Sequence, residues 1–217
     1  TLSDRQGHAL FIGTPKGSAN WSKDIYDMSL THQDWASWQF TTLAGGRVDP
    51  AEIEAARSEM DQRTFRQEYE ATFESYQGRI FYAFERDNIR EFSAPTSWEP
   101  DVLYVGMDFN IDPMSATIGV RVGNDTLHII DEIRMFSSNT QEMVQEIQTR
   151  YPKTRIWVYP DPASRQRKTS AGGATDLSIL QNAGFVVKAP NAHDPVRDGI
   201  NAVNARLCDA TGKRHLL

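Results

Sequence analysis

Three aspartates stand at comparable places in the chain, at or near the ends of predicted elements. Asp108 lies at the end of a predicted strand over residues 102–110, and Asp161 directly follows a predicted strand over 155–159. Asp198 lies in the first turn of a predicted helix over 196–207. If the two strands are parallel neighbours, their carboxyl ends place Asp108 beside Asp161, and the helix can bring Asp198 over the same edge.

Carboxylates gathered in this way repel one another, and a divalent cation relieves the repulsion. Ligands that are all oxygen atoms suit Mg²⁺ or Mn²⁺ rather than Zn²⁺. Taken alone, each aspartate also has a structural interpretation. Asp108 could cap a turn, Asp161 lies between two prolines in a turn, and Asp198 would be favoured at a helix N-terminus. Their joint placement favours a metal site that uses all three.

Other polar residues could support such a site without binding the metal directly. Asp131 and Glu132 end a third predicted strand, and neighbours on a strand point to opposite faces, so only one of them can face the site. His193 could orient a water molecule or a phosphate, and it could also be a surface histidine of a loop. The supporting candidates are Asp112, Asp131, Glu132, His193 and Asp194.

A basic loop follows Asp161, with Arg165, Arg167 and Lys168 in a segment that also contains Ser and Gly. Positive charges beside metal-binding acids suit a phosphodiester substrate, because they can contact its phosphates. A merely solvated loop would have the same composition, so both interpretations stay open. No pairing of Ser or Cys with His stands out, and the sequence gives no support to a covalent nucleophile.

The order of predicted elements indicates a mixed sheet. Three strands come first, over 102–110, 115–122 and 126–133. A tight turn at Gly123 and Asn124 joins the last two, which predicts an antiparallel meander. Helix, strand, helix, strand and helix then alternate to residue 207. This order predicts an α/β fold in which helices pack on a mixed sheet.

The first part of the chain is predicted to be mainly helical. Three helices are expected, over 21–30, 50–60 and 64–73. Two short strands are expected, over 8–13 and 35–43, with the aromatic side chains of the second in a core. A proline-containing linker over 93–100 sets the main boundary, so that the predicted domains are residues 1–95 and 96–217.

The composition is that of an ordinary globular protein: 39% of the 217 residues are hydrophobic, and the formal net charge is −6. The acidic balance argues against a general basic coat for nucleic acid. It does not exclude a nuclease, because such a site is itself a cluster of acids and its basic contacts can be local. The sequence has no apolar run long enough to span a membrane, and its single cysteine suits a reducing cytoplasm.

Five short motifs, in order, resemble the large terminase subunit of tailed bacteriophages, the motor that packages DNA. They are residues 11–17 (FIGTPKG), 65–73 (FRQEYEATF), 106–109 (GMDF), 159–162 (YPDP) and 196–200 (VRDGI). The first is similar to a motif near the end of that family's ATPase domain, and the second to the helix that leads into the nuclease. The last three fall where the family's metal-binding acids lie, so the resemblance carries that role to Asp108, Asp161 and Asp198.

The resemblance implies an RNase H-like nuclease fold, an α/β mixed sheet flanked by helices, preceded by the end of an ATPase domain. It implies cleavage of double-stranded DNA with two divalent ions, about 3.5–4 Å apart, that clamp the scissile phosphate. It also implies contact with the portal protein and the small terminase subunit, and it allows a homo-oligomer on the procapsid. The expected location is the host cytoplasm during virion assembly, away from membranes.

The sequence departs from the family in two ways. It has no GxxxxGK[ST] phosphate loop and no Walker B acid, so this chain alone is not expected to hydrolyse ATP. The family's last strand and tail are cut short after Leu217, and Thr1 is not an initiator Met, so a fragment of a longer protein is expected.

Two alternatives stay open. A resolvase or transposase of the same superfamily would have the same fold, although those enzymes lack the ATPase remnant that residues 14–17 resemble. The chain could also be a structural part of the motor whose acids have lost their metal. Melting curves with added metal separate a metal site from this second alternative.

Overall fold

The computed structural model describes residues 7–75, 78–91, 100–110, 112–161, 175–189 and 195–217. The chain divides into two compact units, of which the first comprises Thr1–Phe84 and Ile200–Lys213. The second comprises Glu85–Gly199 and Arg214–Leu217. Most of the last helix therefore belongs to the first unit, whereas the predicted second domain comprised all of residues 96–217. The described residues include no helix that is long and apolar enough to span a membrane.

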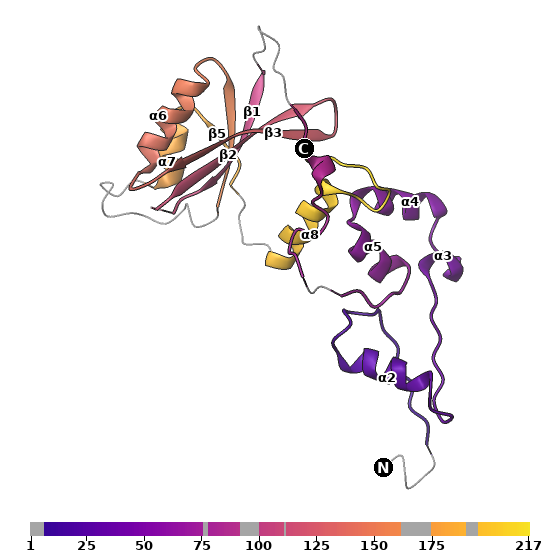
Figure 1. The fold of residues 1–217 in the computed structure, drawn as a ribbon. Helices are drawn as coiled ribbons and strands as arrows, with labels where there is room; N and C mark the ends of the chain where they lie inside the picture. The colour runs from indigo at the N-terminus through magenta and orange to yellow at the C-terminus, as the bar shows by residue number, and fades with distance from the viewer. Residues whose placement is uncertain (1–6, 76–77, 92–99, 111, 162–174, 190–194) are drawn as a thin grey trace. The chain divides into compact units, whose positions relative to one another are not determined.

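The described part of the second unit contains a five-stranded mixed sheet in the order β3-β2-β1-β4-β5 (Figure 1). Its strands are β1 (Val102–Asp108), β2 (Met114–Val122), β3 (Thr126–Met135), β4 (Arg155–Pro160) and β5 (Val186–Val187). β1, β2 and β3 pair antiparallel, and Gly123 takes a left-handed φ of 63° in the β2–β3 turn. β4 pairs parallel with β1, and β5 parallel with β4. The predicted α/β class is confirmed.

The helices α6 (Thr140–Arg150) and α7 (Asp176–Asn182) cover one face of this sheet (Figure 1). Leu103, Val105 and Met107 of β1 are buried on that face, because successive side chains of a strand point to opposite faces. Met143 and Ile147 of α6 belong to the same core. Burial is worth about 1.5–3 kcal/mol for each such side chain, and it fixes which residues of β1 point away from the helices.

The described part of the first unit is helical, as predicted. Its helices are α2 (Trp21–Ser29), α3 (Thr42–Gly45), α4 (Pro50–Glu59), α5 (Gln62–Tyr69) and most of α8 (Val196–Leu207). α4 begins as expected, with the Asp49 carboxylate accepting a hydrogen bond from Ala51 N. The predicted start of α5 is wrong, because Asp61 rather than Thr64 accepts the hydrogen bonds of the first turn.

Both strands predicted in the first unit are wrong. Residues 8–13 and 35–43 take no strand structure, and Ile12 and Trp38 are 89% and 69% exposed. Alternating apolar residues form a strand only beside a second strand that pairs with their backbone, and no described strand pairs with either segment. Of the other aromatic side chains of 35–43 that were expected in a core, Phe40 is 73% exposed, and the ring centroid of Trp35 lies 6.4 Å from that of Phe11.

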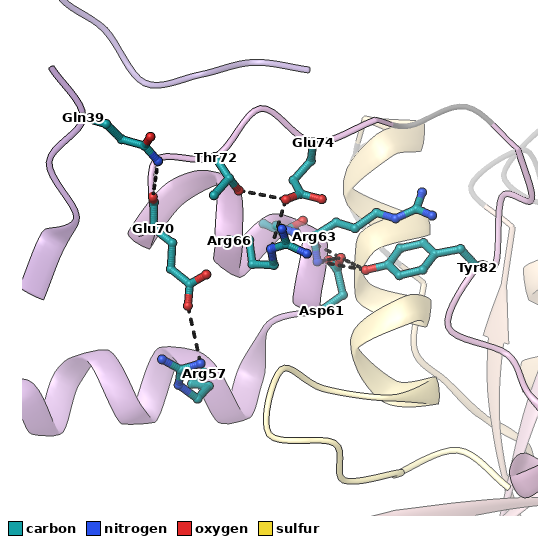
Figure 2. Close-up of polar contacts among 10 residues, drawn as sticks. Gln39, Arg57, Asp61, Arg63, Arg66, Glu70, Thr72, Glu74 and Tyr82 are labelled. Carbon is teal, nitrogen blue, oxygen red and sulfur yellow. Dashed lines mark hydrogen bonds and ion pairs between the residues drawn. The ribbon is translucent and has the colours of Figure 1, made fainter. Parts of the chain in front are cut away.

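Polar side chains connect the segments around α5 (Figure 2). The Tyr82 hydroxyl donates to the Asp61 carboxylate, and Arg63 N donates to the Tyr82 oxygen at 3.0 Å. Burial, together with the bond to Asp61, raises the pKa of Tyr82, so the hydroxyl stays protonated and able to donate. Arg66 Nε lies 3.1 Å from Glu74 Oε1, which fixes the chain just after α5.

Asn204 of α8 holds a neighbouring segment of the first unit. Its side chain donates to Ile80 O at 3.0 Å and to Ile200 O at 3.1 Å. It also accepts from Ala83 N at 3.1 Å. The Asn204 side chain is almost fully buried, where unsatisfied amide groups would be costly. These bonds therefore explain why a polar residue is tolerated on the buried face of α8.

The last residues of the chain belong to the second unit and lie beside β3. Leu127 N donates to His215 O at 2.8 Å, and Leu127 O accepts from Leu217 N at 3.0 Å. Asn88, in the 3₁₀ helix η1 (Arg86–Asn88), donates from its side chain to Leu216 O at 2.8 Å. Part of the β3 edge is thus paired rather than open to another strand.

Candidate functional site

Asp108 and Asp161 lie at the same edge of the sheet because β1 and β4 are parallel neighbours. Met107 pairs with Pro160 at the end of the two strands, and Asp161 N donates to Met107 O at 3.2 Å. The next position along this register holds Asp108 on one strand and Asp161 after the other. The prediction that the carboxyl ends of these strands meet is confirmed.

Both aspartates are exposed and belong to the sheet face that α6 and α7 do not cover. Asp108 follows the buried Met107, and Asp161 follows the buried Pro160 that pairs with Met107. Because successive side chains point to opposite faces, both aspartates belong to the face opposite these buried residues. The Asp108 carboxylate accepts hydrogen bonds from Asn110 N at 3.3 Å and from Asn110 Nδ2 at 2.9 Å. Among the described residues, no cation forms an ion pair with Asp108, so its carboxylate stays accessible to a ligand from solvent.

Asp198 lies in the first turn of α8, as predicted. Its N–H donates to Pro195 O at 2.9 Å, and its side chain is exposed. In the part of the chain that the structure describes, no three His, Cys, Asp or Glu side chains gather as a metal-binding group. The structure therefore joins Asp108 with Asp161 and does not bring Asp198 into such a group with them.

The pairing of β2 with β3 decides which of two neighbouring acids shares a face with Asp108. Asp131 pairs with the fully buried Ile118, and so it belongs to the helix-covered face. Glu132 pairs with the exposed Thr117, on the face that carries Asp108. Of the two acids that the sequence left open, Glu132 is the one on the open face.

Asp131 has partners of its own at the end of α6. Its carboxylate accepts from Arg150 Nη1 at 2.9 Å and from the Tyr151 hydroxyl at 3.0 Å. Burial alone would raise the pKa of Asp131, but hydrogen bonds from Arg150, Tyr151 and the Glu132 N–H outweigh it and hold the pKa below its usual value. Burial and the bond to Asp131 raise the pKa of Tyr151 to about 12. Asp131 is thus used in holding α6 to β3.

Of the other predicted residues, Asp112 is described, and it is an exposed residue of the turn between β1 and β2. The rest lie outside the described residues: Arg165, Arg167, Lys168, His193 and Asp194. Their roles at phosphate or water stay predictions.

Sequence reasoning missed an aromatic group on the same face as Asp108. The ring centroid of Tyr104 in β1 lies 5.8 Å from that of Trp157 and 6.4 Å from that of Tyr159, both in β4. Lys188, just after β5, places its Nζ 4.9 Å from the Trp157 ring centroid. Burial and the neighbouring Tyr104 raise the pKa of Tyr159. The sequence signal for this group was the alternation in β4 of aromatic Trp157 and Tyr159 with buried aliphatic residues.

Comparison with known proteins finds phage large terminases among the similar proteins. No family model matches the chain. The large terminase subunit of Escherichia phage T5 is 32% identical in an alignment of 178 residues that covers 76% of this chain and 40% of that protein. The large terminase of a thermophilic bacteriophage, in a structure with ATP-γ-S, matches with a TM-score of 0.61 and 18% identity, over 92% of this chain and 49% of that one. A further structure of the same thermophilic phage terminase matches with a TM-score of 0.58 and 17% identity, over 89% of this chain and 48% of that one.

The two thermophilic phage structures, at such low identity, bear on the fold alone. They agree with the predicted fold class, a mixed sheet flanked by helices. The chain spans less than half the length of these relatives. The T5 match adds sequence similarity over three quarters of the chain. This chain is therefore a relative of the bacteriophage large terminase subunits and corresponds to part of their length.

Proposed function

We propose that the chain is the nuclease part of a phage DNA-packaging motor, a metal-dependent endonuclease that cuts concatemeric double-stranded DNA. The observation behind this proposal is the adjacency of Asp108 and Asp161 at the ends of two parallel strands, on an open face of the sheet. The relationship to the T5 large terminase subunit supports it. Residues 1–95 would then be the end of an ATPase domain, and residues 96–217 the nuclease domain.

The residues present fit Mg²⁺ or Mn²⁺. Asp108 and Asp161 offer exposed carboxylates side by side, which are the oxygen ligands that such cations prefer. Like charges at neighbouring positions favour a bound cation. Asp198 is the third ligand that the resemblance assigns. When bound, two ions would activate the attacking water and stabilise the charge on the leaving 3′ oxygen.

The protein's own part is to hold the acids and to orient the DNA. Pairing of β1 with β4 fixes Asp108 and Asp161 on strands, and strands position such groups better than loops do. Asn110 Nδ2 orients the Asp108 carboxylate by its hydrogen bond. Glu132 would support the site from the same face, together with Asp112. The loop bases Arg165, Arg167 and Lys168 would contact phosphates beside the cut, and His193 and Asp194 would assist near Asp198.

Nicking of supercoiled plasmid tests the proposal. Wild-type protein should nick it with little sequence preference in Mn²⁺ or Mg²⁺, and not in EDTA. Asp108→Asn and Asp161→Asn should abolish nicking. Asp131→Asn, on the opposite face, is the matched control and should retain it. Folded wild-type protein that is inert in both metals would favour a structural role in the motor instead, and much faster cutting of four-way junctions would favour a resolvase.

We infer the wider setting from the same relationship. The motor would bring this part to double-stranded DNA, to the portal protein and to the small terminase subunit, in the host cytoplasm during virion assembly. Copies of the chain would meet as a homo-oligomer on the procapsid. Pull-down of each protein by this chain, with Asp108→Asn to keep DNA uncut, measures these contacts directly.

A further inference from the structure

Gly106 leaves a gap in the row of side chains next to Asp108. It pairs with Thr117 on β2 and with Tyr159 on β4, and all three residues are exposed on the open face of the sheet. No described atom lies within 4 Å of the position that a Cβ would take at Gly106. The central strand is therefore bare at this point, with a side chain standing on either side.

Neither backbone conformation nor packing within the described residues explains this glycine. Gly106 is not among the glycines with positive φ, and it lies in the middle of a regular strand. At Gly119 of β2, by contrast, a Cβ would lie 3.1 Å from a methyl carbon of Leu127, so packing accounts for that residue. A glycine inside a strand weakens it and often marks a bulge, a tight bend or a place where a ligand or another backbone approaches closely. The register of β1 is regular at Gly106, which leaves the close approach.

The gap lies where a substrate of the aspartates would pass. Residues two apart on a strand share a face and are about 7 Å apart, so the gap at Gly106 is one step from Asp108. Tyr159, which is 43% exposed, borders it. Lys188 lies on the same face beyond Tyr159, because Lys188 N donates to Val158 O at 2.8 Å and its Nζ lies over Trp157. An aromatic ring, with a cation beyond it, thus borders one side of a bare stretch of strand.

We propose that Gly106 is a substrate-binding position, whose missing side chain lets the sugar–phosphate backbone of DNA lie against β1 between Thr117 and Tyr159. This inference rests on the proposed nuclease function and names the surface that positions its substrate. A nucleotide over Gly106 places the adjoining phosphate at Asp108 and Asp161, and Lys188 lies within reach of the next one. A side chain at position 106 would occupy space that no described residue fills and that we assign to the substrate.

Gly106→Ala and Gly106→Val test the inference, with Gly45→Ala in α3 as the matched control, because a Cβ at Gly45 also meets no described atom. Both Gly106 variants should melt at or above the wild-type Tm, since strands favour Val over Gly, and should keep the full rise in Tm that Mn²⁺ gives. Cleavage should nevertheless fall at least tenfold for Ala, chiefly through a higher KM, and further for Val. Gly45→Ala should also melt at or above the wild-type Tm, since helices favour Ala over Gly, and should cleave DNA as the wild type does.

Binding of a fluorescent duplex in EDTA, followed by anisotropy, separates this inference from the proposed function. If wild-type protein cuts DNA and Gly106→Val cuts and binds equally well, the inference alone fails. A Gly106→Ala variant that loses both Tm and cleavage would make the glycine structural and would also overturn it. If wild-type protein binds the duplex without cutting it, weaker binding by Gly106→Val still supports the inference while the nuclease proposal fails. If it neither binds nor cuts, both fail.

Discussion

Replacing Asp108 by Asn should abolish DNA cleavage and leave the metal-free protein about as stable as the wild type. Adjacent strands lie about 4.8 Å apart, so carboxylates about 5 Å apart on β1 and β4 repel by about 0.8 kcal/mol in water. The substitution removes this repulsion from Asp161. It also weakens the exposed hydrogen bonds from Asn110, a loss of about 0.5 kcal/mol. The free energy of unfolding in EDTA should therefore change by less than about 1 kcal/mol.

Manganese should separate the variant from the wild type. A ligand that binds only the folded state raises the free energy of unfolding by about 2.7 kcal/mol at about 100 times its Kd. Each kcal/mol moves the Tm of a chain of this size by about 2–4 °C, so wild-type protein should melt about 5–10 °C higher in Mn²⁺ than in EDTA. If losing one ligand weakens binding about a hundredfold, the gain falls to about 0.4 kcal/mol, or about 1–2 °C.

Asp176→Asn is the matched control, because Asp176 is a buried structural acid. Its side chain is 3% exposed and accepts a hydrogen bond from the Thr140 hydroxyl. The variant should lose about 1–3 kcal/mol of unfolding free energy and keep the whole Mn²⁺ gain. Scanning calorimetry of the three proteins, with and without Mn²⁺, measures both quantities. An Asp108→Asn protein that melts several degrees lower in EDTA and keeps its Mn²⁺ gain would refute the role of Asp108 as a ligand.

Three further predictions concern the basic loop, Asp131 and Asn204. Changing Arg165, Arg167 and Lys168 together to Ala should reduce the salt slope of DNA binding by up to about 0.9 per lost phosphate contact, measured by anisotropy, with little change in Tm. The lowered pKa of Asp131 contributes stability that is present above its ordinary value of 3.8 and is lost as pH falls through the lower value, so Asp131→Asn should flatten the pH dependence of urea unfolding below that value. Asn204→Ala should lower the free energy of unfolding by about 2–4 kcal/mol in urea titrations. Asn201→Ala, at a less buried position of the same helix, is the control and should lower it by less than about 1 kcal/mol.

Each of these has an outcome that contradicts it. A large fall in Tm with an unchanged salt slope would make the basic loop structural. An Asp131→Asn protein with the wild-type pH profile would mean that the ion pair with Arg150 does not change the acid's titration on folding. Equal losses of unfolding free energy in Asn204→Ala and Asn201→Ala would mean that the buried hydrogen bonds of Asn204 add nothing to stability.

Most of the second unit could be predicted because its signals are local. Gly123 marks the turn that makes β2 and β3 antiparallel, and the later alternation of helices and strands leads to the parallel pairing of β1 with β4. The faces of Asp131 and Glu132 could not be predicted, because a shift of one residue in register exchanges them. The register of β2 and β3 does shift, between Ile118 and Gly119.

The first unit was predicted less well, because its structure depends on partners distant in sequence. Residues 8–13, a continuous apolar run, and 35–43 resemble strands in sequence but lack a described strand to pair with. The start of α5 was misjudged because Asp61 and Thr64 are both good caps. Tyr82 favours the earlier one, since its hydroxyl binds the Asp61 carboxylate from 21 residues away, a contact that no local pattern reveals.

The alternation of the chain between its two compact units has a consequence for synthesis on the ribosome. N-terminal segments leave the exit tunnel first and usually fold first. Here Ala83 N and Met60 O, both early in the chain, find their hydrogen-bond partners in Asn204 and Ala210. The nascent first unit must therefore wait, with these groups bound to water, until residues 200–213 emerge. By then every strand from β1 to β5 has been released, so the unit whose first residues emerge earlier cannot be completed until the whole sheet of the other unit is available to form.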